Sequence, residues 1–146
     1  MIRVRRLARK DYSEFRGMVH QLHREDPADK QMTPQKVSRT VNQLRNNPAK
    51  GRILILEEEG RVVGYAILIF YWSNEYGGDI LHIDELYVKP EHRGRGIATT
   101  FLKQLHNKSH AVALELEVTP PNKEALQYYK RLGFKETKNL HLMRPS

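Results

Sequence analysis

The alternation of hydrophobic and polar positions changes its period several times along the chain. Residues 2–7 alternate apolar and basic side chains, which predicts an edge strand. Apolar residues then recur at spacings of three and four, which predicts amphipathic helices over residues 10–25 and 34–47. We expect Asp11 to cap the first helix and Thr33 to cap the second, which begins with a proline.

From residue 52 onward the pattern favours strands, and then strands that alternate with helices. Residues 52–72 are two apolar runs joined through the turn-like sequence EEEG, which predicts a β-hairpin. The later changes of period predict a strand over 79–88, a helix over 96–108, a strand over 111–118, a helix over 123–134 and a closing strand over 136–145. No repeat or change of composition divides the chain. We therefore predict an α/β or α+β domain over residues 1–146, with helices on the faces of a sheet.

Composition and charge narrow the classes of function. The net charge is +8, but the 25 lysines and arginines are spread from Arg3 to Arg144 without a helix-turn-helix or RNA-recognition signature, so no nucleic-acid partner is expected. The chain has no cysteine, which excludes a disulfide framework and a thiol nucleophile. Its histidines have no metal-ligand spacing, so no metal is expected. No apolar run has the length of a signal core or a membrane span, so we predict a cytoplasmic protein without a membrane partner.

The sequence VKPEHRGRGIA, residues 88–98, places a basic glycine turn between a predicted strand and a predicted helix. The start of a helix leaves backbone N–H groups without partners and carries the positive end of the helix dipole. Gly94 and Gly96 have no side chain to block an anion, and Arg93 and Arg95 could add charge-assisted hydrogen bonds to a phosphate. The alternative is an ordinary helix start with solvated arginines. Neither the P-loop spacing nor the GxGxxG spacing is present.

A second motif, PPNKEALQYYKRLGF, covers residues 120–134. Asn122 is a good N-cap, and Gly133 is a good helix terminator. The adjacent Tyr128 and Tyr129 point about 100° apart on a helix, so one can be buried while the other faces a cleft. The alternative is an ordinary amphipathic helix with its tyrosines half in the core.

Together the two motifs resemble those of the GNAT superfamily of acyl-CoA-dependent N-acetyltransferases, [QR]-x-x-G-x-[GA] after a strand and then N-x-x-A-x-x-x-Y-x-x-x-G-F. The matching residues are Arg93, Gly96 and Ala98 in the first motif, and Asn122, Ala125, Tyr129, Gly133 and Phe134 in the second. The resemblance implies a mixed, mostly antiparallel sheet of six to seven strands, flanked by about four helices and splayed between the fourth and fifth strands. Residues 70–88 also resemble the small spermidine/spermine (diamine) acetyltransferases, a much less specific likeness.

The resemblance implies acetyl-CoA as the acyl donor, lying between the strand that ends at Val88 and the strand over 113–118. The diphosphate would lie on the amides of residues 93–98, and the pantetheine would pair with the backbone near Leu86. A helix start and a splayed strand edge supply hydrogen-bonding groups for these two parts. The cofactor-binding residues expected are Leu86, Tyr87, Val88, Arg93, Gly94, Arg95, Gly96, Ile97, Ala98 and Asn122.

The same resemblance implies that Tyr129 is the proton donor to the leaving thiolate, while Tyr128 packs. The group that accepts the proton of the amine stays open: Asp84 is the first choice and Glu85 the second, and His82 is at a matching position. Strict alternation puts His82 and Asp84 on one face of the strand and Glu85 on the other, but a bulge would change the face that Glu85 shows. Alternatively, these groups only pair with surface arginines.

The acceptor site is predicted between residues 23–32 and 71–78. The substrate-binding residues expected are His82, Trp72, Tyr76 and Glu25, with the two aromatic rings as an apolar or cation-attracting wall. Trp72 could equally be an ordinary sheet-edge aromatic. The acceptor would be the primary amine of a small molecule such as a polyamine, a diamine or an amino-acid-like compound, although the net charge disfavours a long polycation. The alternatives are a protein or peptide N-acetyltransferase and a non-catalytic acyl-CoA-binding domain. A homodimer is a further expectation from the resemblance.

Overall fold

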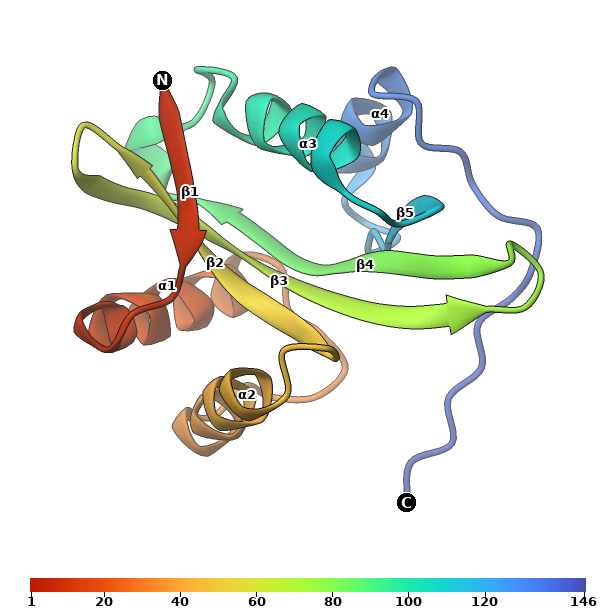
Figure 1. The fold of residues 1–146 in the computed structure, drawn as a ribbon, viewed down its shortest axis with the longest axis horizontal. Helices are drawn as coiled ribbons and strands as arrows, with labels where there is room; N and C mark the ends of the chain where they lie inside the picture. The colour runs from red at the N-terminus through yellow and green to blue at the C-terminus, as the bar shows by residue number, and fades with distance from the viewer.

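The framework of the computed structural model, which describes residues 1–146, is one five-stranded sheet (Figure 1). The strands lie side by side in their order along the chain, and all neighbours are antiparallel except the parallel pair β4 and β5. The bounds are β1 Ile2–Arg6, β2 Gly51–Glu58, β3 Arg61–Ser73, β4 Gly78–Val88 and β5 Ala113–Leu116. The expected mixed, mostly antiparallel sheet is confirmed, but the expected number of six to seven strands is wrong.

Four α-helices and two short 3-10 helices complete the fold. The bounds are η1 Arg9–Asp11, α1 Tyr12–Glu25, α2 Pro34–Asn46, η2 Pro90–His92, α3 Ile97–Lys108 and α4 Lys123–Arg131. Figure 1 shows α1 and α2 on one face of the sheet and α3 and α4 on the other, and we call these the α1/α2 face and the α3/α4 face. The expected four helices are confirmed. None of them combines the length and the apolar character that a membrane span requires.

The central strands are apolar on both sides because helices cover both faces of the sheet. Successive residues of β2 show this arrangement. Ile53 and Ile55 belong to the buried cluster with Phe15 of α1, whereas Leu54 and Leu56 belong to the buried cluster with residues of α3. Ile55 and Leu56 are both 0% exposed, so replacing either with alanine should cost about 2–5 kcal/mol of stability.

Two local predictions are confirmed by backbone geometry. Thr33 caps α2, because its hydroxyl accepts a hydrogen bond of 3.2 Å from the Lys36 amide, and Pro34 begins the helix. The predicted hairpin is β2 and β3, joined by Glu59 and Gly60. Both turn residues have positive φ, 52° and 75°, as a two-residue type I′ turn requires.

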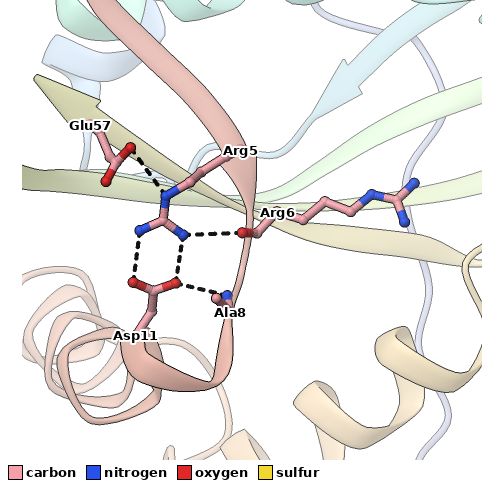
Figure 2. A network of polar contacts seen from close by, with 5 residues as sticks. All are labelled: Arg5, Arg6, Ala8, Asp11 and Glu57. Carbon is pink, nitrogen blue, oxygen red and sulfur yellow. Dashed lines mark hydrogen bonds and ion pairs between the residues drawn. The ribbon is translucent and has the colours of Figure 1, made fainter. Parts of the chain in front are cut away.

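Asp11 has a different role from the predicted cap (Figure 2). It stands at the N-cap position of α1, but its side chain makes no capping hydrogen bond there. Its carboxylate instead accepts two hydrogen bonds from the Arg5 guanidinium, at 2.7 and 2.8 Å, and one of 2.7 Å from the Ala8 amide. Arg5 also pairs with Glu57 of β2 at 3.1 Å. The guanidinium beside it lowers the pKa of Asp11, and the network ties β1, β2 and the start of α1 together.

The predicted closing strand over residues 136–145 is wrong, since this segment has no regular structure and pairs with no strand. Leu140 and Leu142 are 90% and 88% exposed, so they gain no burial that would offset the entropy of ordering the backbone. The predicted strand over 111–118 is also shorter than expected. Only Ala113–Leu116 pairs with β4, which leaves a short edge on which a further strand could form few hydrogen bonds.

Candidate active site

The two parallel strands part in the middle of β4. Pairing with β5 runs from Ile80, opposite Ala113, to Ile83, opposite Leu116, and then stops. The rest of β4, up to Val88, is paired with β3 on one side only. No strand therefore pairs with the β5-facing edge over this part of β4, where the Val88 carbonyl accepts a hydrogen bond from the Arg93 side chain instead. This opening lies where the family resemblance implied a splay between the fourth and fifth strands.

A β-bulge at Asp84 decides which side chains face which side of the sheet. Ile83 lies opposite Leu68 and Glu85 lies opposite Ile67, so Asp84 is the extra residue. Residues directly opposite each other share a face, which places Glu85 on the α1/α2 face with Ile67. His82, opposite Ile69, lies on the same face. Strict alternation, which separated Glu85 from His82, is therefore wrong at this point.

His82 is held between two carboxylates. Its Nδ1 lies 2.8 Å from Glu115 of β5, and its Nε2 lies 3.7 Å from Asp84. Both carboxylates only accept, and the contact with Glu115 is the shorter, so in the neutral ring we assign the proton to Nδ1 and the lone pair to Nε2. Tyr71 donates a hydrogen bond of 2.7 Å to the other oxygen of Glu115. Asp84 first and then Glu115 raise the pKa of His82, which makes its ring a stronger base.

Glu85 is enclosed by its own partners. It accepts hydrogen bonds of 2.7 Å from the Tyr65 hydroxyl and 2.8 Å from His23 Nε2, one on each carboxylate oxygen. Its side chain is 13% exposed, against 51% for Asp84. Burial first, and then the charge of Glu85, raise the pKa of Tyr65, so this phenol stays a donor to Glu85. Of the two predicted bases, Asp84 is the more accessible. The other ring nitrogen of His23, Nδ1, is buried and makes no hydrogen bond.

The glycine turn before α3 presents free backbone donors. Gly94 and Gly96 have φ of 76° and 77°, a conformation that favours glycine. No hydrogen bond within the protein uses the amides of residues 94–99, since the first intrahelical bond runs from Thr100 to Gly96. The Arg93 amide, which was predicted to join them, donates to the Pro90 carbonyl instead. Apart from the glycine itself and its two neighbours in the chain, no atom lies within 4 Å of the position that a Cβ of either glycine would take, so the turn is open.

The two arginines of this turn are already paired. Arg93 donates a hydrogen bond of 2.8 Å to the Val88 carbonyl and pairs with Glu25 of α1 at 2.8 Å, and its guanidinium lies 5.3 Å from the centre of the Tyr87 ring. This pairing raises the pKa of Arg93 and lowers that of Glu25. Arg95 pairs with Glu58 of β2. The backbone amides, rather than the guanidinium groups, are thus the free donors of the turn. Glu25, which was predicted to bind the substrate, is paired with Arg93.

A capping motif at the end of α4 fixes the position of Tyr129. Gly133 has φ of 97°, and the amides of Gly133 and Phe134 donate to the carbonyls of Lys130 and Tyr129. This is a Schellman motif, which turns the chain back so that Phe134 packs on the Tyr129 ring at 5.7 Å. The predicted terminator is therefore confirmed. At the other end of α4, the predicted cap is confirmed as well, because the side chain of Asn122 accepts from an amide of the first turn at 3.2 Å.

The two adjacent tyrosines differ in their hydroxyl groups. Tyr128 is hydrogen-bonded to Thr99 of α3 at 2.7 Å, which fits the predicted packing role. The Tyr129 hydroxyl makes no hydrogen bond within the protein and is not fully buried, and its ring packs against the core of the α3/α4 face. Burial raises the pKa of Tyr129 to about 12, so the phenol keeps its proton at neutral pH. A neutral, unpaired hydroxyl can donate a proton to a leaving group.

A cavity of about 640 Å³ opens between α2 and the sheet on the α1/α2 face. Its sheet side is formed by Ile67, Ile69 and Asp84, and its helix side by Arg39, Thr40, Asn42, Gln43, Leu44 and Asn46. Sequence reasoning missed this cavity, because α2 meets β3 and β4 only through the tertiary fold. The sequence gives one indication of it: several polar residues of α2 lie next to the apolar positions that face the sheet. The predicted aromatic wall lies elsewhere: Trp72 and Tyr76 are 67% and 59% exposed at the end of the β3–β4 hairpin.

Comparisons with known proteins agree with this geometry. Residues 9–134 match the model of the Acetyltransferase (GNAT) family. The thialysine N-epsilon-acetyltransferase of Bos taurus is 37% identical over 75 residues, which are 49% of this chain and 44% of that protein. The chain spans about half of the length of the curated relatives it matches.

Two solved structures share the fold. A possible acetyltransferase from Clostridium difficile 630 has a TM-score of 0.85 and 22% identity, with 100% of this chain and 98% of that one covered. AAC(6')-Iy in complex with the bisubstrate analogue CoA-S-monomethyl-acetylneamine has a TM-score of 0.78 and 16% identity, with 100% and 99% covered.

Proposed function

Because the chain belongs to the GNAT acetyltransferase family, we propose that it transfers an acetyl group from acetyl-CoA to the primary amine of a small molecule by direct attack in a ternary complex. The observation that carries this proposal is the run of free amides at residues 94–99. These residues follow the part of β4 that is paired with β3 but not with β5. A diphosphate requires several donors at once, and an open helix start supplies them together with a favourable dipole. The relative from Bos taurus is named for acetylation of the side-chain amine of a lysine analogue, which supports a small amine as acceptor.

The chain's own residues can bind the donor in two parts. The amides of residues 94–99 would hold the diphosphate, and the edge of β4 at Leu86, Tyr87 and Val88, which no strand covers, would accept the amide-containing arm by backbone pairing. Arg93 supports both parts indirectly, since its guanidinium joins the Val88 carbonyl to Glu25. Of the residues predicted to bind the cofactor, Asn122 has its side-chain oxygen engaged as a helix cap. Its contribution would be to position α4.

At the opening between β4 and β5, side chains from both faces of the sheet could contact the same reacting group. In this proposal His82 and Asp84, on the α1/α2 face, would act on one side of the thioester, and Tyr129, which packs on the α3/α4 face, would act on the other. In the proposed reaction the amine nitrogen forms a bond to the thioester carbonyl carbon, and the bond from that carbon to sulfur breaks. His82 Nε2 or Asp84 takes the proton of the amine, and the Tyr129 hydroxyl gives its proton to the thiolate.

The proposal is tested by the release of free CoA when the protein is mixed with acetyl-CoA and a panel of amines, including a lysine-containing peptide. We expect acetylation of at least one small amine. Tyr129→Phe should lower kcat by about 10²-fold or more, the usual range for a lost general acid. Tyr128→Phe is the matched control, because it removes a neighbouring hydroxyl that bonds only to Thr99. Equal turnover by wild type and Tyr129→Phe would contradict the role of Tyr129, and binding of CoA without any turnover would favour the non-catalytic alternative.

A further inference from the structure

The cavity between α2 and the sheet is lined by one acidic and one basic side chain. Asp84 is its single carboxylate, and it lies beside His82 at the reacting centre proposed above. Arg39 is its single cation, on the helix side. The other lining groups are the neutral Thr40, Asn42, Gln43 and Asn46 and the apolar Leu44, Ile67 and Ile69. The volume of about 640 Å³ lies within the usual range for small-molecule sites.

Arg39 is an exposed residue at the open side of the cavity, and it has no partner of its own. It takes part in none of the ion pairs or side-chain hydrogen bonds of the protein, unlike Arg5, Arg93 and Arg95, which all pair with glutamate or aspartate. A guanidinium without a partner beside a cavity is suited to a planar anion such as a carboxylate, to which it can donate two parallel hydrogen bonds. It also repels a second ammonium group on a ligand whose first ammonium lies at Asp84.

We propose that this cavity binds an acceptor that carries a carboxylate as well as a primary amine, with the amine at Asp84 and the carboxylate at Arg39. This proposal rests on the acetyltransferase function and names its substrate class: amino-acid-like compounds rather than diamines or polyamines. A polyamine carries two or more positive charges and would require several carboxylates, whereas the cavity offers one carboxylate and one opposing cation. The apolar floor of Ile67, Ile69 and Leu44 suits a methylene chain between the two charged ends.

The decisive comparison uses L-lysine and 1,5-diaminopentane, which differ only by the carboxylate. We expect the wild type to acetylate L-lysine with a kcat/KM about tenfold higher or more, the effect of one charge-assisted hydrogen-bonding pair in a partly exposed site. Arg39→Gln should remove this preference, mainly through KM, and Arg39→Glu should reverse it in favour of the diamine. Arg45→Gln is the matched control, because Arg45 lies on the same helix and does not line the cavity.

The proposal is overturned if the wild type prefers the diamine, or if Arg39→Gln keeps the preference for L-lysine. Calorimetric binding of both amines to the CoA-loaded protein separates this result from a failure of the proposed function. If no amine is acetylated but L-lysine binds better than the diamine in an Arg39-dependent manner, the cavity proposal stands and the catalytic proposal fails. If neither turnover nor binding depends on the carboxylate, the cavity proposal fails.

Discussion

The glycine turn at residues 94–99 and the proposed acceptor side of β4, formed by His82, Asp84 and Glu115, differ in the groups that they present. The turn offers backbone amides, and its arginines are paired elsewhere in the protein. The acceptor side offers side chains in a network that joins His82, Asp84 and Glu115 across two strands. Substitutions that change backbone conformation should therefore damage the turn, whereas substitutions that change single side chains should damage the acceptor side.

The largest effect is expected from Gly96→Glu. Gly96 has a φ of 77°, which costs an L-residue about 1–2 kcal/mol, and a glutamate there would place a charge in the open space of the turn. We expect CoA affinity, measured by calorimetry, to fall by about a hundredfold, because both the donor geometry and the charge become unfavourable. Gly77→Glu is a control for backbone strain, since Gly77 has a φ of 67° in the turn before β4, at the end of that strand opposite to residues 94–99. An equal loss of CoA affinity in both variants would contradict a specific role of the glycine turn in binding CoA.

A smaller effect is expected from Glu115→Gln on the acceptor side. Glu115 raises the pKa of His82, so its removal should lower that pKa toward the ordinary value of about 6.5. If His82 accepts the proton of the amine, activity requires the neutral ring and rises with pH through its pKa. The rising limb of kcat/KM against pH should then move to lower pH in Glu115→Gln. An unchanged profile would show that His82 is not the titrating group.

His82 should also make stability depend on pH. Its folded pKa is raised, so its contribution to stability is fully present below the unfolded pKa of about 6.5 and is lost as pH rises through the folded value. Thermal melts should show His82→Gln to be more destabilising, relative to wild type, at pH 5.5 than at pH 9. The opposite order would contradict the placement of His82 between two carboxylates.

The smallest effect is expected from Arg95→Gln. Its guanidinium is half exposed and paired with Glu58, so removing it should weaken CoA binding by roughly threefold or less, through long-range charge alone. A loss comparable with that of Gly96→Glu would mean that Arg95 leaves Glu58 to bind the diphosphate directly. Calorimetry on the two variants under the same buffer distinguishes these outcomes.

The same contrast explains how much could be predicted from the sequence. The glycine turn, the hairpin and the ends of α2 and α4 depend on local chemistry, and the sequence predicts each of them. The bulge at Asp84 has no local marker, since neither glycine nor proline accompanies it, and it changed the face of Glu85. The partners of Arg93 and Tyr71 are 68 and 44 residues away. Such contacts arise only when distant segments pack, so alternation and spacing do not reveal them.

The central claim is that the free amides of the glycine turn bind the diphosphate of the donor. An NMR titration of the ¹⁵N-labelled protein with CoA follows each amide separately. We predict that the largest shift changes fall on residues 94–99, with smaller changes on Leu86 and Val88 and little change on the amides of α2. Shift changes that leave residues 94–99 unaffected while CoA binds elsewhere would contradict the account.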